Sequence, residues 1–381
     1  MRILEITFIP PEKRSGGGMG VFQSILSLSA NGLVDYIGPD FASSLFNEKV
    51  KKLFILHPDK QTKICGYIKN YLTKKVTTSF YSAWKNIEPY IKWENYDIVH
   101  VEASRYQFLV DKVHDNSRKV IIRVHNIEAD YGFNIFKHRR RIGDYLRYYS
   151  FKTNEKQVMK KADGLIFLSQ VDITRAKEIY GIDKPEIYLN PVCVEEREIN
   201  SQNSGSVINI LMTGTLSYGA NSDGVIWFLK QVWSEISCNK KDNKFSLTIA
   251  GSNPPQSIAD LIHTFPDVKL VDTPDNMRIY FESADVYVAS IFYGAGMKVK
   301  VAEALSYGIP VIATDCALVG YENISEGIVQ ANSVVQFIDN IRKTKKLSGE
   351  QRRIIRDCFK ETLSLESSST RYREILNHYV E

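Results

Sequence analysis

The sequence predicts an α/β protein with two Rossmann-like domains, whose parallel sheets face a central cleft. The 381 residues exceed a single typical core. Apolar, strand-like runs alternate with helix-like segments in both halves, which is typical of parallel sheets with helical crossovers. Pro191 interrupts this alternation where the charge balance changes sign. We therefore expect an N-terminal domain over residues 1–190, a C-terminal domain over 191–362 and a final helical segment over 363–381.

The first half contains the runs of the N-terminal sheet. The strands expected there are Ile3–Phe8, Ile98–Glu102, Lys119–His125 and Leu165–Leu168. Helices are expected over Met19–Ala30 and, as one long amphipathic segment, from about Arg139 to Lys161.

The second half starts the pattern again. The strands expected there are Ile208–Thr213, Phe245–Gly251, Val268–Val271, Val286–Ala289 and Pro310–Thr314. Helices are expected from Ser222 to about Ile236, from near Lys298 to Gly308, and from Thr370 onward after a linker-like serine run.

Composition excludes several classes of protein. Apolar residues make up 44% and charged residues 24% of the chain, as in a soluble globular protein. The five cysteines lack CxxC spacing, which fits a reducing compartment and excludes a zinc ribbon. His and Cys show no metal-ligand spacing, so we expect no metal. Without a secretory signal or an apolar run of about 20 residues, the chain is expected to be cytoplasmic.

The charge is unevenly distributed. Residues 1–190 hold 30 Lys and Arg against 21 Asp and Glu, whereas residues 191–381 hold 19 against 23. A basic first half favours an anionic surface or substrate there, and a chance split is the alternative.

The most informative stretch runs from Gly294 to Ile312. A glycine loop leads into a short helix, whose first N–H groups and partial positive charge suit a phosphate. Lys298 and Lys300 add two full charges, and Glu303 lies on the same helical face as Lys300. This pattern favours binding of a pyrophosphate and a ribose diol. An ordinary crossover with a surface Lys–Glu pair is the alternative.

A second glycine loop, Arg14–Gly20, follows the first strand. Seven residues separate the strand from Gly16, which is too far for a dinucleotide fingerprint. Gly16, Gly17 and Gly18 would instead let the backbone approach a bulky ligand. A merely mobile loop is equally consistent with the pattern.

Polar residues follow two strands of the first domain. His125 and Asn126 end one strand, and His125 could donate a hydrogen bond to a substrate hydroxyl or a developing charge. Glu102 and Arg105 lie at the end of the preceding strand and could contact the same ligand. A satisfied structural His–Asn pair is the alternative.

Two turns of the second domain could receive a nucleotide. Gly214 and Thr215 follow its first strand and offer N–H groups and a hydroxyl to phosphate oxygens. Gly251, Ser252 and Asn253 follow the next strand and suit a nucleobase or ribose. The lysine of a Walker loop is missing, so no NTPase motif is present.

A basic run lies in the first half. Lys137–Arg141 precedes Tyr145, Tyr148 and Tyr149, and this combination suits an anionic membrane surface. A solvated helix face is the alternative. No nucleic-acid-binding module surrounds the run, so nucleic acid is not expected as a partner.

Taken in order, these parts resemble the GT-B glycosyltransferases, specifically the family 4-like retaining enzymes (glycosyl transferases group 1) that use sugar nucleotides. The resemblance spans nearly the whole chain and is most specific over Gly294–Thr314, then over Leu211–Phe228. It implies a nucleoside diphosphate sugar bound by the C-terminal domain, an acceptor bound by the N-terminal domain, and a closing helix that returns to the N-terminal domain. No tightly bound cofactor and no metal are implied.

The resemblance also assigns residues to roles. Glu303 matches the glutamate that binds the ribose hydroxyls, while the family's first glutamate is replaced by Ala295. Catalytic roles fall to His125, Lys298, Lys300 and Glu303. The donor would contact Gly214, Thr215, Gly251, Ser252, Asn253, Gly294, Ala295, Gly296, Met297, Lys298 and Glu303. The acceptor would contact Gly16, Gly17, Gly18, Glu102, Arg105 and Asn126.

The predicted function is transfer of a sugar, with retention, from a nucleoside diphosphate sugar to a hydroxyl of a glycan or lipid-linked saccharide. Surface polysaccharide or glycoconjugate assembly is the expected setting, with peripheral contact with the inner face of the membrane. Two alternatives are open. Ala295 favours a catalytically silent subunit that binds a partner transferase or glycan, and an epimerase of nucleotide sugars is the other.

Overall fold

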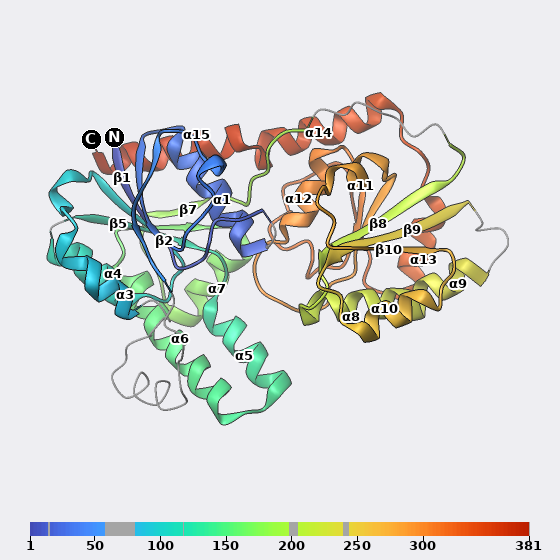
Figure 1. The fold of residues 1–381 in the computed structure, drawn as a ribbon, viewed down its shortest axis with the longest axis horizontal. Helices are drawn as coiled ribbons and strands as arrows, with labels where there is room; N and C mark the ends of the chain where they lie inside the picture. Colours follow the sequence, from blue (N-terminus) through green and yellow to red (C-terminus); the bar gives the residue numbers. More distant parts are fainter. Residues whose placement is uncertain (14–15, 58–80, 117, 198–204, 239–243, 381) are drawn as a thin grey trace. The chain divides into compact units, whose positions relative to one another are not determined.

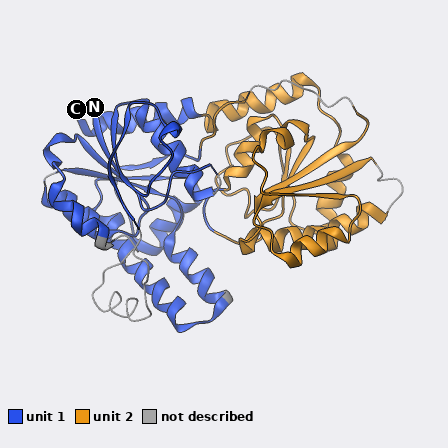
Figure 2. Cartoon of the chain, viewed as in Figure 1, with its two compact units in different colours: residues 1–192, 295–297, 365–381 blue, residues 193–294, 298–364 orange. Residues whose placement is uncertain are grey.

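The chain divides into two compact units (Figure 2). Unit 1 comprises residues 1–192, 295–297 and 365–381, and unit 2 comprises residues 193–294 and 298–364. The computed structural model describes residues 1–13, 16–57, 81–116, 118–197, 205–238 and 244–380. Each unit contains one parallel sheet covered by helices, which is the predicted fold class. None of the described helices combines the length and the apolar character of a membrane span.

The sheet of unit 1 has seven strands in the order β3-β2-β1-β4-β5-β6-β7. The order reverses beside β1, as expected for right-handed crossovers on both faces. The strands are β1 (Arg2–Ile6), β2 (Leu33–Gly38), β3 (Val50–Ile55), β4 (Ile98–Glu102), β5 (Lys119–Val124), β6 (Gly164–Phe167) and β7 (Ile187–Leu189).

The described residues of unit 1 form seven α-helices, of which α5 packs against α6 (Figure 1). They are α1 (Gly16–Ser29), α3 (Tyr81–Ile87), α4 (Gln107–Asp115), α5 (Glu128–Arg139), α6 (Ile142–Lys161), α7 (Gln170–Tyr180) and α15 (Leu365–Val380) among the described residues.

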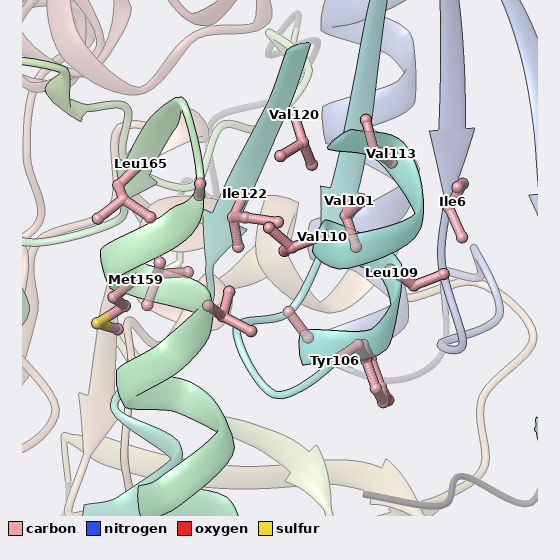
Figure 3. Packing of buried hydrophobic residues seen from close by; sticks show 14 of the residues in the cluster. Ile6, Val101, Tyr106, Leu109, Val110, Val113, Val120, Ile122, Met159 and Leu165 are labelled. Atoms are coloured by element: carbon pink, nitrogen blue, oxygen red, sulfur yellow. The ribbon is translucent and has the colours of Figure 1, made fainter. Parts of the chain in front are cut away.

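The two faces of this sheet differ in chemistry because strand side chains alternate. One face packs its apolar side chains against α4, α6 and α7, as Ile6, Val101 and Ile122 do in Figure 3. The opposite face packs against α1 and α15. On this face Ile3 and Ile98 are apolar, but the residues two positions further along, Glu5 and His100, are polar and fully buried.

Unit 2 has a six-stranded parallel sheet in the order β10-β9-β8-β11-β12-β13. Its strands are β8 (Ile208–Thr215), β9 (Phe245–Ser252), β10 (Val268–Asp272), β11 (Val286–Ala289), β12 (Val311–Ala313) and β13 (Ile328–Gln330). Its α-helices are α8 (Gly219–Trp227), α9 (Ser234–Cys238), α10 (Gln256–His263), α11 (Arg278–Ser283), α12 (Val299–Ser306), α13 (Val334–Lys343) and α14 (Gly349–Leu363). A π-helical segment, Phe228–Trp233, joins α8 to α9.

The glycine run of unit 1 differs from the prediction. Gly16, Gly17 and Gly18 form the first turn of α1 rather than a loop, and Arg14 and Ser15 lie outside the described residues. The buried side chains that follow, such as Val21 and Ile25, fix α1 against the sheet, and the helix extends back through the glycines.

The long helix predicted from about Arg139 to Lys161 is confirmed as α6, which begins three residues later at Ile142 and ends at Lys161. A separate helix, α5, precedes α6 and packs against it, and the basic run lies where the two helices meet, at a turn in which Arg140 has φ 52°. The predicted linker before the last helix is shorter than expected, because α15 already begins at Leu365 and only Ser364 separates it from α14.

Candidate functional site

The carboxyl ends of β8 and β9 lie side by side in unit 2. The parallel register pairs Gly214 with Gly251 and Thr215 with Ser252. A Cβ atom on Gly251 would lie 2.0 Å from the Gly214 carbonyl oxygen, so the two backbones meet closely. Gly214 has φ 149°, which strains any L side chain. The two turns predicted from the sequence therefore form one surface, made largely of backbone.

Lys300 is fixed beside this surface. Its Nζ donates hydrogen bonds to the Thr213 carbonyl oxygen at 2.9 Å and to Asn221 Oδ1 at 2.7 Å. The Asn221 amide in turn donates from Nδ2 to the Thr215 carbonyl oxygen at 3.0 Å. A Cβ atom on Gly214 would lie 2.7 Å from Lys300 Nζ, so the glycine makes room for the ammonium group.

The protonation of Lys300 is finely balanced. Burial and the charge of Lys298 lower its pKa to about 7, against the opposing effect of Glu303. Burial also raises the pKa of Glu303 to about 7, although Arg197 and Lys300 oppose this shift. Both side chains keep part of their surface accessible to solvent. An anion that arrived here would therefore favour the charged form of Lys300.

The start of α12 is held by a tyrosine. Tyr321 donates its hydroxyl to the Lys298 carbonyl oxygen at 2.8 Å and accepts the Ala302 N–H at 3.1 Å. The hydroxyl thus bridges two groups that would bond each other directly in a regular helix. N–H groups of a first helical turn have no intrahelical acceptor, so this end of α12 can bind an anion together with Lys300.

The loop before α12 contains two glycines with positive φ. Gly294 has φ 121° and Gly296 has φ 70°. Ala295, Gly296 and Met297 group with unit 1, whereas Gly294 and Lys298 on either side belong to unit 2. The five residues predicted to contact the donor in this loop are thus shared between the units. Asn253, with φ 52°, ends the adjacent β9 turn.

Unit 1 carries a buried charged cluster on the face of its sheet that packs against α1. Glu102 has no exposed surface, and its Oε2 accepts hydrogen bonds from His125 Nε2 and, at 3.5 Å, from Arg123 Nη1. Burial alone would raise the pKa of Glu102, but the charges of Arg123 and His125 outweigh it and lower the pKa. The His125 side chain is 15% exposed. Glu102 therefore fixes the position of the His125 ring. The Glu102 carboxylate itself is covered by protein rather than open to a ligand.

A second pair continues this cluster toward α15. His100 Nδ1 and Glu5 Oε2 are 2.6 Å apart, and His100 Nε2 lies 3.3 Å from the Tyr372 hydroxyl. The Tyr372 hydroxyl is also 2.8 Å from Ser24 Oγ on α1. The C-terminal helix thus contributes directly to the polar core behind His125.

Glu5, His100 and Glu102 could be read as a metal site, because their ligand-type atoms lie within 4.8 Å of one another. The Oε1 atoms of Glu5 and Glu102 have no hydrogen-bond partner among the described residues. However, the charge of Arg123 acts on all three groups, and its guanidinium would repel a divalent cation. We interpret the cluster as ion pairs. That no metal is needed stays a prediction.

The remaining residues predicted to contact the acceptor lie elsewhere in unit 1. Arg105 donates to Glu128 Oε2 at 3.2 Å, and its guanidinium lies over the Phe151 ring at 5.3 Å. Asn126 follows His125 and is partly exposed. Of Gly16, Gly17 and Gly18, only Gly16 and Gly17 are exposed at the start of α1.

Sequence reasoning missed the residues that hold the predicted ones in place. Asn221, Tyr321, Arg123 and Tyr372 each bind a site residue or its immediate neighbour. Asn221 and Arg123 lie inside the motifs singled out from the sequence, so their polarity was a usable signal. Tyr321 and Tyr372 carry no such signal, because their roles depend on packing alone.

Comparisons with known proteins agree with this architecture. Residues 208–345 match the family described as Glycosyl transferases group 1. An uncharacterized 44.6 kDa protein in the cps region of Klebsiella pneumoniae is 27% identical in an alignment of 273 positions that covers 67% of each chain.

Solved structures of similar fold cover the whole chain. A glycosyltransferase from Rickettsia africae ESF-5 has a TM-score of 0.69 and 15% identity over 100% of this chain and 98% of its own. WaaG, a glycosyltransferase involved in lipopolysaccharide biosynthesis, has a TM-score of 0.66 and 14% identity over 99% of both chains. The chain therefore has the GT-B fold of these structures, and within it residues 208–345 of unit 2 match the group 1 glycosyl transferases.

Proposed function

We propose that the protein transfers a sugar, with retention of anomeric configuration, from a nucleoside diphosphate sugar to a hydroxyl of a glycan or lipid-linked saccharide. The observation that carries the proposal is the position of Lys300, held by Thr213 and Asn221 beside the glycine turn of β8. A fixed cation next to bare backbone suits a diphosphate.

The residues of unit 2 would act on the leaving group. The bond between the anomeric carbon and the diphosphate oxygen breaks, and negative charge develops on that oxygen. Lys298, Lys300 and the start of α12 stabilise this charge, so their effect is greatest in the transition state. Glu303 accepts hydrogen bonds from the ribose hydroxyls. The turns at Gly214–Thr215 and Gly251–Asn253 contact the rest of the nucleotide.

The residues of unit 1 would act on the acceptor. The acceptor oxygen forms its new bond on the face of the sugar that the diphosphate leaves, and its proton passes to the departing phosphate oxygen. His125, oriented by Glu102, donates a hydrogen bond to a sugar hydroxyl. Neither a metal nor a tightly bound cofactor takes part in this scheme, because protein cations neutralise the diphosphate.

The expected setting is assembly of a surface polysaccharide or glycoconjugate on the cytoplasmic side of a membrane. WaaG, which shares the fold, acts in lipopolysaccharide biosynthesis. The 30 basic residues among the first 190 favour contact with an anionic surface or acceptor. Nucleic acid is not a proposed partner.

The first test is thermal shift with UDP-, GDP-, ADP- and dTDP-sugars, followed by turnover with the donor that stabilises the protein. We expect free nucleoside diphosphate to appear together with sugar linked to an acceptor. Lys300→Ala and Glu303→Ala should abolish transfer while the thermal midpoint of the free protein stays close to that of the wild type. Wild-type turnover by either variant would refute the site assignment. Binding without turnover of any donor would instead favour the silent subunit.

A further inference from the structure

A buried carboxylate on α6 joins four segments of unit 1. Glu155 has no exposed surface. Its Oε1 accepts hydrogen bonds from Ser104 Oγ at 2.6 Å and from the Glu128 N–H at 3.0 Å. Its Oε2 accepts the Ala129 N–H at 3.0 Å and the Tyr180 hydroxyl at 2.6 Å. Each carboxylate oxygen therefore has two donors from the protein itself.

The two backbone contacts fix the start of α5. The N–H groups that reach Glu155 belong to the first two residues of this helix, and Ile127 at the N-cap provides no side-chain cap. N–H groups at this end have no intrahelical acceptor, so the carboxylate takes the place of a cap and faces the positive end of the helix dipole. Only residues 125–127 separate α5 from the end of β5. The short loop that carries His125 is thus held at both ends.

The contact with Ser104 fixes the neighbouring loop after β4. Ser104 follows Ala103, which has φ 90° although it is not a glycine. A residue with a side chain keeps such a φ only where its surroundings impose it. The Ala103 N–H donates to the Arg123 carbonyl oxygen on β5 at 3.0 Å, and Ser104 donates to Glu155 on α6. The strained residue is therefore held from both sides, directly after Glu102.

An ion pair also joins the two loops to each other. Arg105, which follows Ser104, donates from Nη1 to Glu128 Oε2 at 3.2 Å. A residue after β4 thus binds the first residue of α5, and Glu155 binds both segments from behind. The loops after β4 and β5 are therefore fixed as one unit.

We propose that Glu155 is a positioning residue for sugar transfer, which sets the place of His125 by fixing the loops after β4 and β5 to each other. Glu155 does not reach a substrate itself, because protein covers it completely. Its effect passes through the start of α5 to His125, and through Ser104 to Glu102, which binds His125. Because this role concerns sugar transfer, it rests on the proposed function.

The test compares Glu155→Gln and Ser104→Ala with the wild-type chain. Glutamine keeps the shape of the side chain, but its amide would face one of the two α5 N–H groups, donor against donor, whichever way it is turned. Ser104→Ala removes only the link to the loop after β4. Turnover is measured at pH 8, where the carboxylate is mostly ionised, because burial raises the pKa of Glu155 to about 7.

We expect kcat/KM for the acceptor to fall about 10- to 100-fold in Glu155→Gln, because a small displacement of a positioned group is enough for such a loss. Ser104→Ala should show a smaller fall in the same direction. The Kd of the nucleoside diphosphate should change little in either variant, since that ligand is assigned to unit 2. A loss confined to donor binding would contradict the proposal.

Tyr180→Phe is the matched control. It removes one hydrogen bond to the same carboxylate, but the hydroxyl comes from α7, which carries none of the predicted site residues. Its kcat/KM for the acceptor should stay close to that of the wild type, even where its thermal midpoint falls. Equal kinetic losses in all three variants, in step with their thermal midpoints, would show that Glu155 acts on stability alone and would overturn the proposal. So would wild-type kinetics of Glu155→Gln.

A second measurement needs no substrate. In protein with isotope-labelled histidine, the NMR signal of the His125 ring is assigned by its loss in His125→Gln. Glu155→Gln and Ser104→Ala should move this signal, whereas Tyr180→Phe should leave it in place. An unmoved signal in Glu155→Gln would overturn the proposal whether or not turnover is found. Absence of turnover by the wild type, with a signal that moves as expected, would count against the proposed function alone.

Discussion

Lys300 Nζ lies 2.7 Å from Asn221 Oδ1, although 79 residues separate the two in the sequence. Asn221 is itself anchored to the Thr215 carbonyl oxygen at 3.0 Å. The ammonium group is thus oriented by an amide that cannot change its charge. Asn221 is therefore a positioning residue for the cation that we assign to the diphosphate.

Asn221→Ala should lower kcat/KM about 10- to 100-fold, because a hydrogen bond to a charged group contributes about 1.5–3 kcal/mol. Steady-state kinetics with the donor found by thermal shift measure the effect. Asn340→Ala removes the same amide from α13 and should leave kcat/KM unchanged. Equal effects of the two substitutions would show that Asn221 does not orient Lys300.

Binding of a nucleoside diphosphate should take up a proton. With a pKa of about 7, Lys300 is mostly neutral at pH 8 in the free protein, and an adjacent diphosphate favours its charged form. Isothermal titration calorimetry at pH 8, in two buffers of different ionisation enthalpy, should report uptake approaching one proton. Lys300→Met should abolish most of this uptake, whereas Glu303→Gln should not.

The lowered pKa of Lys300 should also make the stability of the protein depend on pH. A lysine whose pKa is lowered on folding binds fewer protons in the folded state between pH 7 and about 10.5. Its contribution therefore makes the free energy of unfolding rise with pH over that window, and Lys300→Met should flatten the rise. Denaturant unfolding of both proteins from pH 7 to pH 9 measures the difference. An unchanged slope would contradict the lowered pKa.

Gly214→Ala should impair both the fold and the site. The residue has φ 149°, and the added Cβ atom would lie 2.7 Å from Lys300 Nζ and 2.8 Å from Asn221 Nδ2. We expect a loss of about 1–3 kcal/mol in the free energy of unfolding and weaker donor binding. Gly16→Ala is the control, because no atom lies within 4 Å of its Cβ position and the added methyl group should change the free energy of unfolding little. If Gly214→Ala changed neither the free energy of unfolding nor donor binding, the turn would be able to accommodate the added methyl group.

Arg123→Met should lower the free energy of unfolding by much more than the small change in side-chain volume suggests. It leaves the buried Glu102 carboxylate with the histidines His125 and His100 and removes its strongest cationic partner, at a cost of about 3–5 kcal/mol. Combining it with Glu102→Gln should restore part of the stability, since no buried charge is then left unpaired. Urea denaturation of the two single variants and the double variant gives the coupling energy. Additive effects would exclude the ion pair as the cause.

Much of the fold was accessible from local patterns. The runs Ile98–Glu102 and Val286–Ala289 coincide with β4 and β11. By contrast, the helical state of Gly16–Gly18 was not foreseen. It depends on packing of α1 against the sheet, which can outweigh the preferences of the residues at the helix boundary.

The sequence by itself determined the two parallel sheets and where the glycines and lysines of the candidate site occur. Alternating apolar runs and glycine turns reflect backbone energetics within a few residues, and these can be read along the chain. Only the tertiary structure decided that Asn221 orients Lys300, that Glu102 is covered behind His125, and that Tyr372 reaches His100. Such pairings depend on strand register and on the face to which each side chain points, because those alone bring distant residues within hydrogen-bonding distance.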